Sequence, residues 1–383
     1  MGNKKVKKSL LLAPNSFKKC ADSVQITKIL SSELKKSIDW QIIEKPLSDG
    51  GDGFLQVCEL LFKGTRLTYL IKNIYDEQLN PVDVVYSKEN KLVIIESAEV
   101  LGLKRISDEF RNPMLLNSKV LGDLIHLIKS DVFTEKIDVE KVIVGIGGTA
   151  TVDFGIGAAS VFGMKLLDND NNKLEIIPAN YLKVKEIVYS KPALPFDLEV
   201  VADVKTPLFG KNNAIEMYSK QKGANQNHIK ELVSGFTNIY NLLLNNNLIH
   251  SDRQLNGAGG GLSAGLEVFF HAKIISSEVF IEEILLSDIE KSSIDAVITG
   301  EGAFDEQSLQ NKGAHIIIEK FREYNKPIFL ICGTIEKSIA GNLPPMVKVI
   351  QLIDFFSSKD ESIKYYKTGL QNAAKVIINH LNY

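Results

Sequence analysis

The sequence predicts an α/β fold, because strand-like and helix-like segments alternate along the chain and glycine-rich loops follow several of the strands. Short runs of Val, Ile and Leu end directly in glycine or polar residues, and such runs suit strands covered on both faces of a parallel sheet. Amphipathic patterns typical of helices lie between these runs. The expected strands are 10–13, 92–96, 142–145, 199–203, 296–299, 328–332 and 347–353, and the expected helices are 23–36, 114–130, 227–245, 313–324 and 359–381.

Length and composition limit the class of protein. A chain of 383 residues is long for a single hydrophobic core, so two domains are expected. The net charge of −2 lacks the basic excess of a nucleic-acid-binding protein, and no apolar run approaches the length of a membrane span. Cys20, Cys58 and Cys332 are widely separated, which argues against a disulfide framework and against a paired-cysteine metal site. We therefore expect a soluble cytoplasmic protein with neither a nucleic acid nor a membrane as partner.

Five loops rich in glycine or polar residues are the most informative local feature. Ligands of open α/β sheets bind beyond the carboxyl ends of the strands, and glycine there lets backbone N–H groups approach phosphate oxygens. One such loop alone would favour a simple tight turn. Five loops, four of them with carboxylate, hydroxyl or ammonium groups in or beside them, favour a phosphate ligand. The loops are 14–18, 49–53, 145–149, 257–261 and 300–302.

Acidic residues in or beside these loops indicate a metal–nucleotide site. A single acidic residue is usually only a solvated surface group. A group of them at several strand ends of one protein suits magnesium and a nucleotide. Lys18 and Lys222 are the best placed cations, because each lies in a short polar loop. The acidic residues are Asp49, Asp153, Asp203, Glu301 and Asp305.

Known nucleotide motifs are absent or weak in this sequence. It contains neither the Gly-x-x-x-x-Gly-Lys-Ser/Thr phosphate loop nor the motifs of protein kinases, so a kinase activity would need another architecture. Residues 145–150 fit the dinucleotide pattern Gly-x-Gly-x-x-Gly/Ala after a strand. An isolated match of this kind is weak evidence, so an NAD-dependent oxidoreductase is only a third interpretation.

The order of motifs over nearly the whole chain adds a family resemblance. These motifs are 13–18, 46–53, 111–113, 145–153, 202–204, 207–208, 221–224, 259–266, 298–302 with Asp305, Gln307 and Lys312, and 332–334. In this order they resemble the bacterial glycerate kinase family of glycolate, glucarate and galactarate catabolism. The resemblance implies two α/β domains, one flavodoxin-like with a parallel sheet and one mixed, with the active site in the cleft between them.

The resemblance also implies domain limits and an activity. We expect a discontinuous flavodoxin-like domain, 1–75 plus 285–383, and a second mixed α/β domain, 76–284. The implied reaction transfers phosphate from ATP to D-glycerate, mostly to give 2-phosphoglycerate, with ATP and Mg²⁺ as cofactors. D-glycerate is the expected small-molecule partner, and a homodimer is an open possibility.

Roles for individual residues follow as hypotheses. Asp203 or Asp49 would accept the proton of the substrate hydroxyl, and Glu301 and Asp305 would organise magnesium. Arg111 would pair with the substrate carboxylate, since guanidinium binds carboxylate in a bidentate manner. The other substrate-binding residues would be Ser16, Lys18 and Lys222. The nucleotide-binding residues would be Gly147, Gly148, Thr149, Gly259, Gly260 and Gly261, aided by Lys18.

The sequence also departs from the family pattern. Asn15 stands where the family usually has Asp, and Ala303 replaces an Arg. Residues 117–122 replace a Thr-rich run, and the apolar Val120 and Leu121 cannot donate hydrogen bonds to a small hydroxy acid. Two alternatives therefore stay open: a kinase of another small hydroxy acid or polyol, and a non-catalytic protein that binds nucleotide or a small acid.

Overall fold

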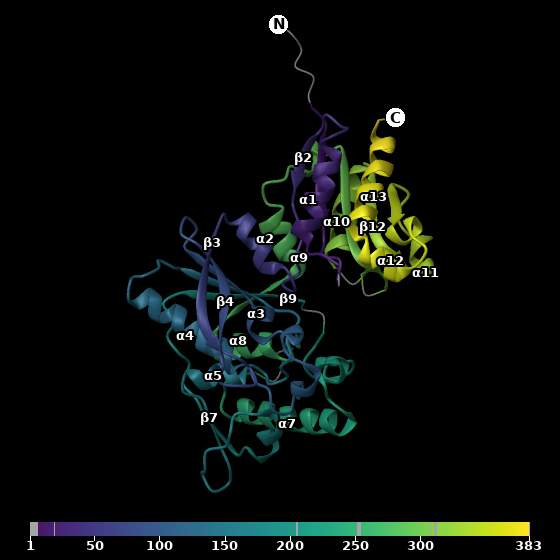
Figure 1. Ribbon diagram of the computed structural model, residues 1–383. Helices are drawn as coiled ribbons and strands as arrows, with labels where there is room; N and C mark the ends of the chain where they lie inside the picture. The colour runs from purple at the N-terminus through teal and green to yellow at the C-terminus, as the bar shows by residue number, and fades with distance from the viewer. Residues whose placement is uncertain are drawn as a thin grey trace. The chain divides into compact units, whose positions relative to one another are not determined.

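The computed structural model describes residues 7–18, 20–203, 206–250, 254–306, 308–309 and 312–382. The motif positions Val204 and Gln307 lie outside these described residues. The chain divides into two compact units, which are shown in Figure 1. Unit 1 comprises Met1–Asp49 and Ser277–Tyr383, and unit 2 comprises Gly50–Ser276. Of the helices in the described ranges, not one combines the length and the apolar character that crossing a membrane requires.

Unit 1 is built on a five-stranded parallel sheet. Its strands lie in the order β2-β1-β11-β12-β13, which is 2-1-3-4-5 when the strands of this unit are numbered along the chain. This is the strand order of flavodoxin-like folds, in which the direction of winding reverses between the first and third strands. The strands are β1 (Ser9–Pro14), β2 (Gln41–Glu44), β11 (Ala296–Phe304), β12 (Ile328–Ile335) and β13 (Val347–Gln351).

Helices from both ends of the chain cover one face of this sheet. The first helix, α1 (Ser23–Leu34), packs against the last, α13 (Tyr366–Leu381), so the purple and yellow segments of Figure 1 lie side by side. Leu10 and Leu12 of β1 contribute to the core under these helices. Asp22 caps α1 by accepting a hydrogen bond from Gln25 N at 2.8 Å. The remaining helices are α9 (Ser277–Val279), the π-helix Phe280–Leu285, α10 (Gly313–Phe321), α11 (Lys337–Ala340) and α12 (Lys359–Lys364).

Unit 2 is built on a six-stranded mixed sheet in the order β10-β9-β6-β5-β4-β3. The first four strands in this order are parallel, and β4 and β3 run antiparallel at the other edge. The strands are β3 (Thr65–Lys72), β4 (Leu79–Ser87), β5 (Leu92–Glu96), β6 (Lys141–Gly145), β9 (Asp197–Ala202) and β10 (Lys273–Ser276). A separate antiparallel pair consists of β7 (Lys165–Leu167) and β8 (Glu186–Val188).

The helices of unit 2 enclose its main hydrophobic core. Val93 and Ile95 of β5 point into this core, which α4, α5, α7 and α8 complete. The short helix α2 packs against β4 and β5. The helices are α2 (Phe54–Leu61), α3 (Ser97–Leu101), α4 (Lys119–Phe133), α5 (Ile156–Val161), α6 (Ala214–Tyr218), α7 (Gln226–Asn245) and α8 (Leu262–Phe270).

The predicted fold class is confirmed, with one parallel and one mixed sheet, and each of the seven expected strands is a strand. Two helix predictions need correction. The helix expected over 114–130 begins only at Lys119, whose N–H is held by the Asn117 side chain at 2.9 Å. The helix expected over 359–381 is two helices, because Tyr365 leaves the helical conformation with φ −109° and ψ 29°.

The unit limits differ from the expected domain limits of 75/76 and 284/285. Residues 50–75 belong to unit 2, because β3 pairs with β4 along its whole length. Residues 277–284 belong to unit 1. The placement of an active site between the two domains stays a prediction.

Replacing Gly300 of β11 by alanine tests how closely β11 and β12 pack. A Cβ atom at Gly300 would lie 2.1 Å from the carbonyl oxygen of Ile331, which is backbone and cannot turn aside. We expect Gly300→Ala to lower the free energy of unfolding by at least about 2 kcal/mol. Gly341→Ala is the matched control in the same unit, because a Cβ there meets nothing within 4 Å. Urea unfolding that shows equal stability for both variants would contradict this packing.

Candidate functional site

The site in unit 1 begins where β1 and β11 end side by side. Pro14 and Gly300 are paired in the parallel ladder, and Asn15 N donates a hydrogen bond to Gly300 O at 2.8 Å. Asn15 is buried, and its Oδ1 accepts a hydrogen bond from Ser16 N at 2.8 Å. This edge is the point where the winding of the sheet reverses, and ligands of open α/β sheets bind at such points.

Glu301 is a buried carboxylate at this edge. Its side chain is only 7% exposed, and Oε1 has no hydrogen-bond partner among the described residues. Burial raises the pKa of Glu301 to about 7, and the carboxylates of Asp305 and Asp49 also raise it, while Lys312 and Ser308 lower it. A buried carboxylate oxygen without a hydrogen-bond partner costs free energy, and a bound cation would supply that partner.

The residues around Glu301 suit Mg²⁺, which takes ligands from water and phosphate, better than a metal ion whose ligands all come from the protein. Among the described residues, no three His, Cys, Asp or Glu side chains form a metal-binding group. Mg²⁺ commonly uses one or two carboxylates, with phosphate and water as its other ligands. Asp305 is the second acidic residue, and its Oδ1 accepts a hydrogen bond from Ser308 N at 3.1 Å. The residues present therefore fit Mg²⁺ bound together with a phosphate ligand.

Lys18 and Asp49 complete the sequence-predicted residues of unit 1. The backbone N of Lys18 lies beside Gly302, where a Cβ on that glycine would come within 3.2 Å. The Lys18 side chain is exposed. Asp49 is half-buried, and its carbonyl oxygen accepts a hydrogen bond from the Ser277 hydroxyl at 2.8 Å. Unit 1 thus brings together Asp49, Glu301 and Asp305, closely enough for their charges to interact.

In unit 2 the loop after β6, residues 145–148, packs against residues 50–53. A Cβ on Gly147 would lie 2.4 Å from the Cα of Gly51. The backbone conformation of Gly148 has φ +62°, and a Cβ there would lie 3.1 Å from Asp52 Oδ1. Gly147 is therefore required by packing, whereas Gly148 is exposed and its backbone can face a ligand.

The glycine run 259–261 separates in the same way. Gly260 and Gly261 are buried, and a Cβ on Gly260 would lie 2.3 Å from the carbonyl oxygen of Thr151. Gly259 is only half-buried, although a Cβ there would lie 2.8 Å from Ile146 Cγ2 and 3.6 Å from Thr149 Oγ1. Gly259 therefore joins Gly148 among the more accessible residues of the predicted nucleotide site, whereas Thr149 is buried.

Lys222 lies beneath this loop instead of in solvent. It is 4% exposed, and its Nζ donates to Thr151 O at 2.8 Å and to Thr149 Oγ1 at 3.3 Å. Burial lowers the pKa of Lys222 to about 7, and the Asp153 carboxylate opposes this shift. Among the described residues, Lys222 thus stabilises the predicted nucleotide loop through Thr149 and Thr151. Its predicted substrate-binding role has no test in the structure.

Arg111 makes its contacts with its own loop. Its Nε donates to Ile106 O at 3.1 Å, and its Nη2 donates to Leu103 O at 3.1 Å. The remaining Nη1 forms an ion pair with Asp108. The pairing of Arg111 with a substrate carboxylate stays a prediction, and it would require exchange of the Asp108 contact.

The two acidic residues of unit 2 differ in their surroundings. Asp203 follows β9 and is exposed, and its carbonyl oxygen accepts a hydrogen bond from Asn256 Nδ2 at 3.1 Å. Asp153 is fully buried and accepts hydrogen bonds from Ser118 N and Oγ, both at 2.7 Å, and from Gly157 N at 3.0 Å. Asp153 therefore joins the starts of α4 and α5, which is a structural role.

The sequence argument about residues 117–122 needs correction. Val120 and Leu121 are buried in the core of unit 2, as part of α4. Ser118 is held by Asp153, and Asn117 Nδ2 donates to Ile176 O at 2.8 Å. Since the apolar pair faces the core, its lack of hydrogen-bond donors does not indicate a changed substrate.

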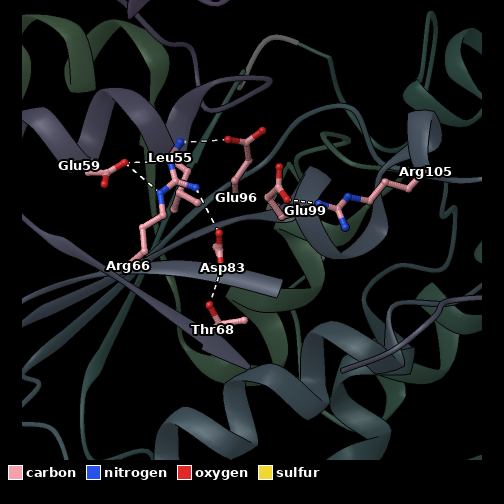
Figure 2. Close-up of polar contacts among 8 residues, drawn as sticks. All are labelled: Leu55, Glu59, Arg66, Thr68, Asp83, Glu96, Glu99 and Arg105. Atoms are coloured by element: carbon pink, nitrogen blue, oxygen red, sulfur yellow. Dashed lines mark hydrogen bonds and ion pairs between the residues drawn. The ribbon is translucent and has the colours of Figure 1, made fainter. Parts of the chain in front are cut away.

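Glu96 and Ser97 are the important polar residues that sequence reasoning missed. Glu96 ends β5 and accepts hydrogen bonds from Gly53 N at 3.2 Å and Leu55 N at 3.0 Å, and the second of these is drawn in Figure 2. Ser97 Oγ accepts a hydrogen bond from Gly147 N at 3.2 Å. A glutamate that closes a run of buried apolar residues was the available sign, because such an acid needs partners.

A pH series of unfolding tests the buried state of Lys222. A lowered native pKa means that the folded protein loses this proton near pH 7, whereas the unfolded chain keeps it to about 10.5. Stability from this group is therefore present at high pH and lost as pH falls through 7. We expect urea unfolding of the wild type to show a rise of up to about 2 kcal/mol from pH 7 to 9. Lys222→Met should lack this rise.

Lys220→Met is the control for Lys222→Met, because Lys220 lies in the same short 3₁₀ helix, Lys220–Lys222, but is exposed. It should keep the pH dependence of the wild type. Identical slopes for all three proteins would show that Lys222 is not held as a buried amine.

Comparison with known proteins supports the resemblance seen in the sequence. The model of the glycerate kinase family matches residues 10–382. A glycerate kinase of Neisseria meningitidis serogroup B is 27% identical over 97% of this chain and 98% of its own length. A glycerate kinase of Halalkalibacterium halodurans is 28% identical over 96% and 97%, respectively. A glycerate 2-kinase of Escherichia coli K12 is 27% identical over 86% of each chain.

The fold has a counterpart among solved structures. A crystal structure from Salmonella typhimurium LT2, provisionally named glycerate kinase 2, superposes with a TM-score of 0.77 at 22% identity, over 98% of this chain and 99% of that one. At this identity the likeness concerns the fold alone. The family match, in contrast, extends over almost every residue. The chain therefore belongs to the glycerate kinase family.

Proposed function

We propose that this protein transfers the γ-phosphate of ATP to D-glycerate and releases 2-phosphoglycerate, with Mg²⁺ as cofactor. The proposal is supported by family membership and by the names of the relatives, one of which is a glycerate 2-kinase. The observation that carries it is Glu301, a buried carboxylate at the reversal point of a flavodoxin-like sheet, whose Oε1 has no hydrogen-bond partner among the described residues. Such a carboxylate suits a metal-bound phosphate.

In this proposal the charge of the phosphates is balanced from unit 1. Glu301 and Asp305 would hold Mg²⁺, which supplies charge neutralisation to the transferring phosphoryl group when bound. Lys18, whose side chain is exposed, would add a further positive charge. Asp49 or Asp203 would accept the proton of the glycerate hydroxyl. A strongly basic group is not needed, because phosphoryl transfer depends mainly on positioning and electrostatic stabilisation.

Unit 2 would supply backbone donors to the nucleotide. The predicted residues are Gly147, Gly148, Thr149 and the 259–261 run. The N–H groups of Gly147 and Gly261 already donate to Ser97 Oγ and Gly257 O, so the accessible backbone of Gly148 and Gly259 gives these two the leading part. Lys222 would support the loop from below through Thr149 and Thr151. Its positive charge, when present, would also favour a phosphate above the loop.

Two further residues are proposed to recognise the substrate. Arg111 is proposed to bind the glycerate carboxylate, and Ser16 is proposed to bind a substrate hydroxyl. Ser16 follows Asn15 at the end of β1, is half-buried, and donates its backbone N–H to Asn15 Oδ1. A cytoplasmic location is part of the proposal and suits three cysteines that are all free. A homodimer stays a prediction.

The proposed reaction is tested by ADP release from MgATP with the purified protein. We expect release that depends on D-glycerate and is much slower with L-glycerate and related acids, and phosphorus NMR should identify 2-phosphoglycerate. Turnover with another hydroxy acid, and none with D-glycerate, would show that D-glycerate is not the substrate. An ATP-binding protein without turnover on any acid would favour a non-catalytic binder and would contradict the proposed function.

Two single variants separate the candidates for the proton acceptor. Either Asp49→Asn or Asp203→Asn should lower kcat by about 100-fold or more, because loss of a general base commonly has effects of this size. The other variant should change kcat less than about tenfold. Asp39→Asn is the control, since that carboxylate is highly exposed and pairs only with Lys7 in the contacts of the described residues. If neither variant changes kcat beyond the control, both assignments are wrong.

A further inference from the structure

Glu96 acts as an N-cap for a helix to which it does not belong. The residue before α2 is Gly53, with φ +88°, and it has no side chain to cap the helix. Glu96, which lies 43 residues further along the chain from Gly53, accepts hydrogen bonds from Gly53 N through Oε1 and from Leu55 N through Oε2. It is 3% exposed, so both oxygens are removed from water and depend on these donors.

The loop held in this way is in tight backbone contact with the predicted nucleotide loop. A Cβ on Gly145 would lie 2.7 Å from Gly50 O and 2.4 Å from Phe54 Cδ1, the first residue of α2. A Cβ on Gly147 would lie 2.4 Å from the Cα of Gly51. Because Gly145 and Gly147 are in direct contact with residues 50, 51 and 54, a shift of residues 50–54 must displace residues 145–147.

Ser97, the next residue along the chain, holds the second loop directly. Its Oγ accepts from Gly147 N at 3.2 Å and can donate to Gly147 O at 3.3 Å. Glu96 and Gly145 are also paired in the ladder between β5 and β6. The last residue of β5 and the first residue of α3 thus fix the two loops by consecutive side chains.

We propose that Glu96 is a positioning residue for phosphoryl transfer, which fixes residues 50–54 and, through them, the 145–148 loop of the nucleotide site. This inference rests on the proposed kinase function. Glu96 does not touch substrate or nucleotide, because both of its oxygens are engaged by backbone N–H groups. Its contribution comes from holding Gly147 and Gly148 in the geometry that phosphate binding requires.

The charged groups around Glu96 give this role a pH dependence. Glu99 of α3 and Asp52 of the loop face it, and these are paired with Arg105 and Lys104. The Glu99–Arg105 pair is visible in Figure 2. Cys58 of α2 is the third titratable neighbour. Burial raises the pKa of Glu96 to about 7, and Glu99 and Asp52 contribute to the increase, while the two backbone N–H groups oppose it.

Ionisation of Glu96 should affect activity and stability in opposite directions. The carboxylate accepts both N–H groups, whereas in the acid one oxygen carries the proton and accepts poorly. Positioning therefore improves as pH rises through 7. Stability from a raised native pKa is present below the unfolded value of about 4.5 and is lost as pH rises through 7. If Glu96 had only a structural role, its ionisation would change stability with pH but would leave activity unchanged.

The test is a pH profile of kcat from about 5.5 to 9 for the wild type, Glu96→Gln and Glu99→Gln. The wild type should gain activity near pH 7. Glu96→Gln, which mimics the protonated acid, should lack this increase and show a kcat about 10- to 100-fold lower at pH 8, with KM values changed less than about threefold. Glu99→Gln should reach the wild-type plateau, with the increase moved to lower pH.

Each other outcome argues against the proposal. An increase near pH 7 that persists in Glu96→Gln would assign it to another group, such as Glu301. A lower melting temperature of Glu96→Gln with unchanged kcat would show a structural role only. If Glu96→Gln fails to fold, the pH profile of Glu99→Gln tests the proposal instead. An increase of kcat at lower pH than in the wild type supports the proposal, and an unchanged profile overturns it.

Failure of the kinase assignment can be distinguished from failure of this inference. If the wild type releases no ADP with any acid, the proposed function fails first. Amide hydrogen exchange of residues 50–61 then tests the positioning by itself. At pH 8 exchange in this segment should be faster in Glu96→Gln than in the wild type, while exchange in α7 stays the same. Equal exchange in residues 50–61 would overturn the role of Glu96.

Discussion

The backbone contact between residues 50–53 and residues 145–148 is the constraint on which the arrangement of unit 2 depends. A Cβ on Gly50 would lie 2.4 Å from Val201 O at the end of β9, and one on Gly147 would meet Gly51. The loop before α2 thus rests directly on the carboxyl ends of β6 and β9. Because the glycine backbone of the loop contacts the ends of these strands directly, the position of the loop is set by the sheet, and α2 and its cap at Glu96 follow from that position.

Glycine in these loops has two different physical reasons, and the sequence alone does not separate them. Gly260 lacks a Cβ because the carbonyl of Thr151 occupies the space, whereas Gly148 is exposed and adopts φ +62°. Both residues lie in similar glycine-rich segments of the sequence. The distinction depends on neighbours distant along the chain, such as Thr151 for Gly260 and Asp52 for Gly148, so only the folded structure shows which backbone groups are accessible to a ligand.

The predictable part of the fold was the part buried on both faces. β5, β6 and β11 are runs of buried apolar residues and were predicted, while β3 was not, because most of its side chains are partly exposed at the sheet edge. The same strand explains why unit 2 already begins at Gly50, since β3 pairs with β4 along its whole length. In the site, the residue types were predictable from motifs, but Lys222 and Asp153 required knowledge of burial.

Two buried glutamates show why partners, and not burial alone, indicate a role. Burial raises the pKa of Glu96 and of Glu301 to about 7. The oxygens of Glu96 each have a backbone donor, so the protein already satisfies this carboxylate and its effect is internal. Glu301 Oε1 has no partner within the described residues. Removal of a partner from a buried charge commonly costs about 3–5 kcal/mol. A bound cation would supply the partner that this oxygen lacks, so we propose metal binding at Glu301 and a positioning role at Glu96.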